Sequence, residues 1–410
     1  MRSNPNIRLT FVGDLLCMPH QIMAAQRRED AFEVAFSKVK PLLQGANYVL
    51  GNLETPIAGK LAGYAKEEAN FNAPDAFVTA VKNAGIDFVS TANNHCLDRG
   101  IEGLCRTLDM LDQVGLDHSG SYRAYEDREA IFIKEIEGVK IAVLACTYGT
   151  NSECGRYRLT KDTEWHVDIL RPQPAKYTRR YSIWEKVLTT MGALVFPARI
   201  RYMIKQCLYM RREGHSYYVD YSCDTVNPAE IGIEAHTPYI RRMKEKIHRA
   251  KELADFVVVL PHLGGQYNPS PGLYQQYSME WMSEAGADLI VANHAHTPLY
   301  FERNNQGVFV CYALGDFCTT PVRNGIGSLT LADYSVVLNV EIDATQKRMV
   351  GASYSIVKNV VDSEGISCVV PVQELERQLV TGSARERLSV DVSAVVRRFG
   401  ETYARYEPAL

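Results

Sequence analysis

The sequence predicts a layered α/β fold, and three observations lead to this expectation. Short apolar strands alternate with longer helical patterns between Ile7 and Ala145, which is typical of domains that stack helices on sheets. Gly85 and Gly115 stand where helices are expected to end and separate them from the next strands. The same alternation resumes at Tyr239, so the α/β pattern covers most of the chain.

The first part of the chain contains strand–helix pairs followed by a hairpin. Glu137 and Gly138 separate two apolar runs, Ile131–Ile136 and Val139–Ala145, as the turn of a hairpin does. Before them, the patterns predict strands over Ile7–Leu16, Tyr48–Leu53 and Phe88–Thr91, and helices over Phe32–Leu43, Ala76–Ala84 and Ile101–Val114.

The second part repeats this order and ends in helices. We place a main domain at residues 1–340, and a C-terminal strand and helical extension packed on it at 341–410. Helices are expected over Tyr239–Leu253, Leu273–Ala285, Val372–Leu379 and Val390–Phe399, and strands over Phe256–Leu260, Asp288–Ala292, Val308–Leu314 and Tyr334–Ile342.

Residues 148–235 interrupt the alternation as a basic and aromatic insertion. Apolar residues from Ile200 to Leu208 lie at helical spacing, opposite a face with several arginines, and predict an amphipathic helix. One interpretation is a helical excursion that packs on the main domain and keeps its basic face in water. The alternative is a lid over an anionic substrate, or a patch within 182–214 that makes peripheral contact with a membrane or a partner.

Composition narrows the class of protein. The chain has 410 residues, 46% of them hydrophobic and 23% charged, which is ordinary for a globular enzyme. Its net charge of -3 gives no general attraction to nucleic acid, so no nucleic acid is expected as a partner. The ten cysteines form no C-x-x-C motif, and no apolar run is long enough to cross a bilayer. We therefore expect reduced thiols and a cytoplasmic protein without a transmembrane segment.

Polar donor groups follow five of the predicted strands. Ligands of open α/β sheets bind outside the carboxyl ends of the strands, so such groups converge when the strands are neighbours. The junctions are Gly13-Asp14, Asn52-Leu53-Glu54, Asn93-Asn94-His95 followed by Asp98, Pro261-His262, and Asn293-His294-Ala295-His296.

These donors suit divalent metal ions. Imidazole and carboxylate together favour Zn, Mn or Fe. His294 and His296 lie two residues apart, and on an extended segment both rings would point to the same side because the side-chain period of a strand is two. The donors outnumber the needs of one tetrahedral ion, so we expect two divalent ions roughly 3.5–4 Å apart and bridged by a carboxylate.

Each junction also has an ordinary structural explanation. A Gly-Asp pair after a strand is most often a turn, and Asn52 and Asn94 could be capping or turn amides. His262 alone would suit a hydrogen-bonded core histidine, and Asp98 could cap the helix that begins near Ile101. The joint occurrence of five junctions favours a metal centre over these separate explanations.

The motifs resemble those of the CapA family of bacterial capsule and poly-γ-glutamate synthesis proteins, which is similar in turn to calcineurin-like metallophosphoesterases. The resemblance implies a four-layer α/β/β/α sandwich with metal ions at the sheet edge. It spans roughly residues 7–320 and rests on the five junctions and on the run Tyr312-Ala313-Leu314-Gly315-Asp316-Phe317.

The resemblance also implies a role for each donor. His95 would lie beside the substrate as an acid or transition-state donor, and Asp98 is the second catalytic candidate. The metal ligands would be Asp14 and His296 on the first ion, Glu54 between the ions in place of the usual bridging aspartate, and Asn94, His262 and His294 on the second ion.

Several positions depart from the family pattern. Leu16 stands where phosphoesterases carry a histidine two residues after the first aspartate, so we expect a weaker first site unless Asp98 or water compensates. Asn293 stands where a glycine is common, and among the other residues asparagine is one of the few that readily adopt the left-handed region. Asp316 replaces a frequent asparagine and adds negative charge near the site.

The expected function is that of a metal-dependent hydrolase. It would cleave a phosphoester, or a related anionic small molecule or polymer, with a metal-activated water, in a process linked to capsule or poly-γ-glutamate synthesis. Two other interpretations stay open. One is a non-catalytic accessory protein of that synthesis, whose pocket only binds; the other is an amide hydrolase acting on γ-glutamyl bonds.

Overall fold

The structure is a computed structural model that describes most of the chain. The interior of the predicted insertion, residues 174–233, lies outside the described residues, and so do the amphipathic helix and the lid expected there. The described residues are 6–66, 70–152, 157–173, 234–268, 270–321, 331–379, 382–400, 402 and 404–407.

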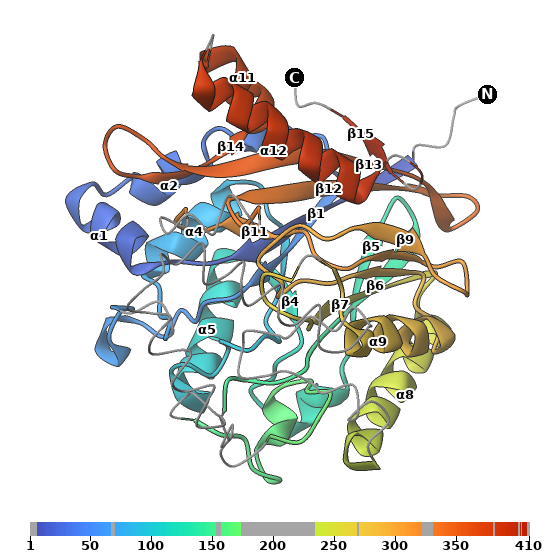
Figure 1. Cartoon of the computed structure of the whole chain (residues 1–410). Helices are drawn as coiled ribbons and strands as arrows, with labels where there is room; N and C mark the ends of the chain where they lie inside the picture. Colours follow the sequence, from blue (N-terminus) through green and yellow to red (C-terminus); the bar gives the residue numbers. More distant parts are fainter. Residues whose placement is uncertain are drawn as a thin grey trace, which may run out of the picture.

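Two sheets form the centre of the described structure (Figure 1). In the first sheet the strands run in the spatial order β14 (Ser367–Pro371), β13 (Arg348–Val361), β12 (Tyr334–Asp343), β1 (Asn6–Leu15), β2 (Tyr48–Leu53), β3 (Phe88–Ser90) and β4 (Asp117–Ser119). Two short strands join it, β11 (Asp316–Cys318) beside β1 and β15 (Arg405–Tyr406) beside β13. The second sheet has the order β5 (Phe132–Ile136), β6 (Val139–Thr147), β7 (Phe256–His262), β8 (Leu289–Val291), β10 (Phe309–Cys311) and β9 (Phe301–Arg303).

Helices cover the outer faces of both sheets, and Figure 1 shows the two groups on opposite sides of the molecule. The first sheet carries α1 (Pro19–Arg27), α2 (Ala31–Phe36), α3 (Lys40–Leu43), α4 (Asp75–Asn83) and α5 (Gly100–Val114). The second sheet carries α8 (Thr237–Leu253) and α9 (Leu273–Glu284). Near the C-terminus follow α11 (Val372–Gln378) and α12 (Ser383–Phe399). Short 3₁₀ turns lie at Lys60–Ala62, Tyr125–Glu129, Glu164–His166 and Glu234–His236.

Three apolar clusters separate these layers. Leu9 and Phe11 of β1 face Val143 and Val258 of the second sheet in the cluster between the sheets. The next residue of β1, Val12, belongs to the cluster between the first sheet and its helices, as the alternation of a strand requires. A third cluster lies between the second sheet and α8 and α9. The predicted four-layer α/β/β/α sandwich is therefore confirmed.

Parallel pairing brings the carboxyl ends of the central strands to one edge. In the first sheet, β1, β2, β3 and β4 are parallel neighbours, and β11 runs parallel to β1. In the second sheet, β6, β7, β8 and β10 are parallel neighbours. All five predicted junctions follow strands of these two groups.

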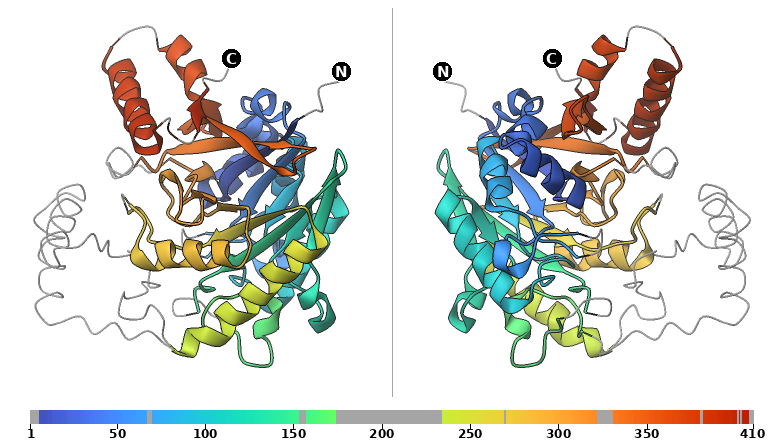
Figure 2. Two further views of the ribbon diagram at one scale, coloured as in Figure 1. Left: turned by 90° about the vertical axis from the view of Figure 1, so that its right-hand side faces the viewer. Right: turned by 90° about the vertical axis from the view of Figure 1, so that its left-hand side faces the viewer.

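The C-terminal part of the described chain completes the first sheet. β12 lies antiparallel between β1 and β13, so residues late in the chain pair with the first strand. Figure 2 shows α11 and α12 at the end of the molecule where both termini lie. Phe399 of α12 packs on Phe301, with ring centroids 4.4 Å apart. Arg398 donates hydrogen bonds to Thr297 Oγ1 (3.1 Å) and to the carbonyl of Pro298 (2.7 Å), which ties α12 to the loop after His296.

Two predicted helices are wrong in their extent. The helix expected over Val390–Phe399 begins earlier, at Ser383. The pattern over Phe32–Leu43 is not a single helix but two, α2 and α3, separated by a turn at 37–39. Ser37 donates its hydroxyl to the carbonyl of Val34, and Pro41 lies in the first turn of α3, where its missing N–H costs nothing. The apolar spacing continues across the break because both short helices pack on the same sheet face.

A buried ion pair joins α8 to the segment that precedes residue 174. Lys246 Nζ lies 2.7 Å from Asp168 Oδ2, with the two side chains only 5% and 8% exposed. Tyr122, which follows β4, donates its hydroxyl to the same carboxylate oxygen. The network therefore links the edge of the first sheet to a helix on the second. None of the described helices is long and apolar enough to cross a bilayer.

Candidate metal centre

The six predicted metal ligands lie together at the common edge of the two sheets. Asp14 is the last residue but one of β1, and Glu54 follows β2 directly. Every one of the six is buried, with exposed fractions of 0% for Asp14, Glu54 and His294, 1% for Asn94 and His262, and 6% for His296. The structure thus brings together donors from five separate stretches of the chain.

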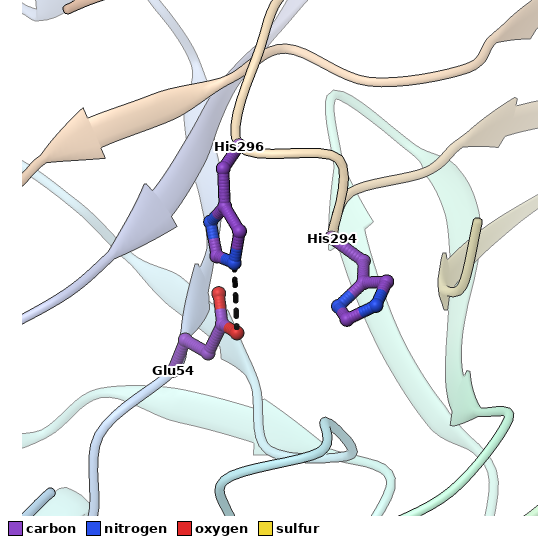
Figure 3. A group of neighbouring side chains, drawn as sticks. All are labelled: Glu54, His294 and His296. Carbon is purple, nitrogen blue, oxygen red and sulfur yellow. Dashed lines mark ion pairs between the residues drawn. The ribbon is translucent and has the colours of Figure 1, made fainter. Parts of the chain in front are cut away.

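Glu54 lies in the middle of the cluster. Its Oε1 is 3.4 Å from His262 Nε2 and 3.9 Å from His296 Nε2. Figure 3 shows the carboxylate of Glu54 and the ring of His296 pointing at each other, with His294 reaching in from the same loop as His296. A ligand atom from each of Glu54, His294 and His296 lies within 4.8 Å of the others, and the same holds for Asp14, Glu54 and His262. Glu54 is thus placed to serve two neighbouring positions, as the bridging role predicted for it requires.

Amides complete the inner part of the cluster. Asn94 Oδ1 lies 2.8 Å from His262 Nε2, and His294 Nδ1 lies 3.1 Å from the same nitrogen. Asn52 donates its amide to Asp14 Oδ1 at 2.7 Å and lies 3.1 Å from His262 Nδ1. Asn52 therefore holds the first carboxylate and an imidazole in place at once.

The two sheets contribute different kinds of donor. The oxygen donors Asp14, Glu54 and Asn94 follow strands of the first sheet. The imidazoles His262, His294 and His296 lie at the ends of β7 and β8 in the second sheet. The centre therefore exists only where the two sheets meet.

Burial and mutual repulsion make the cluster costly without a cation. Burial raises the pKa of Asp14 well above its ordinary value, and the neighbouring Glu54 carboxylate raises it further. Burial also raises the pKa of Glu54, to about 7. The pKa values of His262 and His294 are lowered well below the usual range, first by burial and then by other imidazoles, so both rings stay neutral and keep a lone pair for a metal ion.

Unsatisfied atoms in the cluster fit divalent ions. Apart from the neighbouring Asp14 carboxyl, neither oxygen of Glu54 has a hydrogen-bond partner among the described residues, and neither does His294 Nε2. Buried polar atoms without partners are rare in folded proteins, and they call for an explanation. The 3.9 Å between Glu54 Oε1 and His296 Nε2 is too long for a hydrogen bond, but it is within the span of two ligands that share one ion at metal–ligand distances of about 2.0–2.2 Å.

The two predicted catalytic residues form a pair beside the cluster. His95 Nδ1 lies 2.8 Å from Asp98 Oδ2, and the same oxygen accepts a hydrogen bond from the backbone N–H of Phe71. Asp98 therefore does not cap α5, whose N-terminal cap is Arg99 without a side-chain hydrogen bond. Burial opposes protonation of His95, but the Asp98 carboxylate outweighs it and raises the pKa of His95 above its ordinary value. The ring is therefore suited to hold a proton.

The backbone of the His-x-His segment is not the extended segment that we expected. β8 ends at Val291, and His294 and His296 have φ angles of 104° and 53°. Non-glycine residues in this region cost roughly 1–3 kcal/mol each and cluster at functional sites. Asn293, where left-handed backbone was anticipated, has no positive φ, and its side chain instead accepts a hydrogen bond from the N–H of Leu314. The two rings face one centre because of a strained loop rather than strand alternation.

Leu16 lies away from the centre. It belongs to the apolar cluster between the first sheet and its helices, and is 4% exposed. The register of β1 against β2 shifts between Phe11 and Asp14, and both Leu15 and Leu16 belong to this apolar cluster, so strict alternation does not aim residue 16 at the site. No side chain from this position reaches the donors.

Asp316 and Asn151 lie near the centre although neither was among the predicted ligands or catalytic residues. Asp316 Oδ1 lies 2.8 Å from His296 Nδ1, and Asp14, His296 and Asp316 form a third group of close ligand atoms. Asn151 accepts a hydrogen bond from Asn94 and places its amide nitrogen 3.4 Å from both ring nitrogens of His95. The sequence signals Asp316 only through its Gly-Asp run, while Asn151 follows β6 without a motif.

Comparison with known proteins identifies a family and several relatives. The family model described as bacterial capsule synthesis protein PGA_cap matches residues 8–320. The chain is 25% identical over 319 residues to the capsule biosynthesis protein CapA of Bacillus anthracis, covering 77% of this chain and 60% of that protein. It is also 25% identical over 317 residues to the PGA biosynthesis protein CapA of Bacillus subtilis (strain 168), covering 77% and 64%. The matched part of the chain thus spans less than two thirds of either relative.

Solved structures with a similar arrangement share little sequence. A crystal structure described as a novel phosphatase of Mycoplasma pneumoniae has a TM-score of 0.43 and 12% identity, covering 86% of this chain and 94% of the other. GAP50 of Plasmodium, described as an anchor in the inner membrane complex, has a TM-score of 0.37 and 10% identity, with 98% of both chains covered. The family assignment rests on sequence instead. Because the family model covers more than half of the chain and every residue of the donor cluster, this protein belongs to the family of bacterial capsule synthesis proteins PGA_cap.

Proposed function

We propose that this protein is a metal-dependent hydrolase that cleaves a phosphoester or a related anionic substrate in capsule or poly-γ-glutamate synthesis. The observation that carries the proposal is Glu54, a fully buried carboxylate that lies among imidazoles and has no N–H donor in the part of the chain that the structure describes. The names of the Bacillus relatives support the link to capsule and PGA synthesis. We further propose the cytoplasm as its location, which the free thiols of the seven described cysteines support.

The residues present suit two divalent ions, with Mn, Fe or Zn favoured by the mixed oxygen and nitrogen donors. As the family resemblance implies, Asp14 and His296 would hold one ion, Asn94, His262 and His294 the other, and Glu54 both. The groups of close ligand atoms among the described residues overlap these two sets, and Glu54 belongs to two of the three groups. When bound, such ions lower the pKa of water and polarise a phosphoryl or carbonyl oxygen.

The chain itself supplies orientation and a proton. Asp98 fixes the ring of His95 through Nδ1, which leaves Nε2 as the atom that can donate a proton to a leaving oxygen. Phe71 packs against the same ring, with centroids 4.3 Å apart, and restricts its movement. The amide of Asn151 lies beside His95, where it can orient a substrate oxygen.

Metal analysis and parallel hydrolysis assays test the proposal. The purified protein is analysed for bound metal, stripped with chelator, reloaded with Mn²⁺, and assayed with an aryl phosphate and a γ-glutamyl aryl amide. We expect bound divalent metal and Mn²⁺-dependent hydrolysis of the phosphate. Glu54→Gln should lose both, whereas Glu135→Gln, which changes an exposed residue of β5, should keep both.

Each other outcome rejects part or all of the proposal. Absence of metal, or hydrolysis that survives Glu54→Gln, would overturn the metal-dependent hydrolase. Hydrolysis of the amide alone would replace the phosphoesterase with the γ-glutamyl hydrolase. Metal binding with neither reaction would favour the non-catalytic accessory protein. The apolar Leu16, which stands where phosphoesterases carry a histidine, is the feature of this chain that favours that interpretation.

A further inference from the structure

The first metal position of this chain is short of one donor. Position 16 adds no imidazole beside Asp14, because Leu16 packs into the apolar core on the helix side of the first sheet. The close ligand atoms around Asp14 form two groups, one with Glu54 and His262 and one with His296 and Asp316. A metal position with few strong ligands binds its ion more tightly when neighbouring groups hold those ligands in the right orientation.

β11 places the carboxylate of Asp316 beside Asp14. It pairs in parallel with β1, and Asp316 stands in register with Asp14. The two strands approach closely because Gly13 and Gly315 have no side chains; a Cβ at Gly13 would lie 1.7 Å from the carbonyl oxygen of Gly315. Asn359 donates a hydrogen bond to the carbonyl of Asp316 and holds this short strand from the other side.

The contact between Asp316 and His296 orients the ring. Asp316 Oδ1 lies 2.8 Å from Nδ1, and Nε2 of the same ring faces Glu54. Both side chains are buried, with exposed fractions of 4% for Asp316 and 6% for His296, so water does not compete for the bond. A carboxylate that accepts the hydrogen of Nδ1 fixes the tautomer and makes Nε2 a better ligand.

We propose that Asp316 is a positioning residue of the metal centre, which accepts the Nδ1 hydrogen of His296, directs Nε2 towards Glu54, and so compensates for the imidazole absent at position 16. This inference rests on the proposed metal-dependent function. It explains why a carboxylate stands at this position even though it adds charge beside Asp14 and Glu54.

Calorimetric titration with Mn²⁺ alone tests the proposal on the chelator-stripped protein. Asp316→Ala should weaken Mn²⁺ binding by about 10–100-fold without changing the number of ions bound. Asp316→Asn keeps an oxygen that can accept the Nδ1 hydrogen, so it should remain within several-fold of the original protein. Asp391→Asn is the matched control, since Asp391 of α12 is 8% exposed but accepts a hydrogen bond from the hydroxyl of Tyr334 in β12.

Thermal unfolding in chelator separates positioning from a general structural role. Asp316→Asn keeps the hydrogen bond to His296 and relieves repulsion with Asp14 and Glu54, so this variant should not unfold at a lower temperature than the original protein without metal. Asp316→Ala also removes a buried partner of His296, and some loss of metal-free stability is expected from it. A fall in the metal-free stability of Asp316→Asn, or binding of Mn²⁺ by Asp316→Ala within twofold of the original protein, would overturn the inference. Loss of one ion in both variants would also overturn it, in favour of direct coordination by Asp316.

Failure of the proposed function gives a different result. If the original protein binds no Mn²⁺, both proposals fail together. If it binds Mn²⁺ and hydrolyses the aryl phosphate while Asp316→Ala binds normally, only the role of Asp316 is rejected.

Discussion

His95 is held on three sides. Asp98 bonds its Nδ1, Phe71 packs on its face, and the amide of Asn151 lies 3.4 Å from both ring nitrogens. The contacts with Asp98 and Phe71 involve no metal ligand, whereas Asn151 also accepts a hydrogen bond from Asn94. Replacing His95 removes none of the ligand side chains, so the donors should stay in place.

Replacing His95 should separate catalysis from metal binding. His95→Ala should lower turnover of the aryl phosphate by about 10²–10⁴-fold, because a positioned acid contributes that much to a proton transfer. Metal content, measured on the same preparations, should not change. Loss of metal in this variant would mean that His95 is a ligand and not an acid. Asp98→Asn should lower turnover less, since an amide oxygen can still accept the hydrogen of Nδ1.

The identity of most donors could be predicted at the residue scale, but their conformation could not. Asp14, Glu54 and His262 are recognisable because each stands where a strand ends. The positive φ angles of His294 and His296 have no signature, since histidine rarely adopts them and only the surrounding fold enforces them.

At the scale of elements, the close pairing of β1 and β11 sets the distance between Asp14 and Asp316. Asp14 donates its backbone N–H to the carbonyl of Gly315 at 3.0 Å. Gly315 itself has a φ of 83°, and a Cβ there would lie 2.7 Å from the carbonyl oxygen of Tyr334. Neither glycine can be exchanged without moving a strand.

Gly13→Ala should therefore damage both stability and the metal centre. A Cβ at 1.7 Å from a backbone oxygen forces β11 away from β1, and we expect a loss of about 3 kcal/mol or more in the free energy of unfolding. Denaturant unfolding without metal gives the stability, and Mn²⁺ titration gives the affinity. Gly45→Ala is the control, because its Cβ would meet only Arg8 Nη1, at 3.7 Å. Equal stability and equal Mn²⁺ affinity of the two variants would contradict the close approach of β1 and β11.

Strands that pair locally were easier to predict than strands that pair with distant parts of the chain. β1, β2 and β3 lie in an alternating pattern with their helices, and the hairpin of β5 and β6 has a recognisable turn. β11 is three residues long, and its partner is the first strand, so no local pattern marks it. The role of Asp316 was missed for the same reason.

At the scale of the whole molecule, the buried pair of Lys246 and Asp168 connects layers that belong to different sheets. Such a pair contributes little by itself, but removing one partner leaves an uncompensated buried charge. Because the pair lies at the edges of both sheets, it holds the layers of the sandwich together.

Lys246→Met should lower the free energy of unfolding by about 3–5 kcal/mol, because it leaves Asp168 buried without its cation. Adding Asp168→Asn should recover most of this loss, since the amide can still accept the hydroxyl of Tyr122 without carrying charge. Denaturant unfolding measures both. Lys251→Met, which breaks the more exposed pair with Asp288, should cost about 0–1 kcal/mol. If the double variant is no more stable than Lys246→Met, the loss of stability comes from lost packing of the lysine side chain and not from the buried charge of Asp168.

The order of the strands along the chain bears on how the protein is made. Among the described strands β1 leaves the ribosome first, yet its neighbours β11 and β12 emerge among the last. The early part carries Asp14, Glu54 and Asn94, while His262, His294 and His296 arrive much later. A chain synthesised as far as Asn94 therefore offers only the oxygen donors of the centre, which suit magnesium or calcium. Discrimination in favour of softer cations can arise only after His262, His294 and His296 have been added.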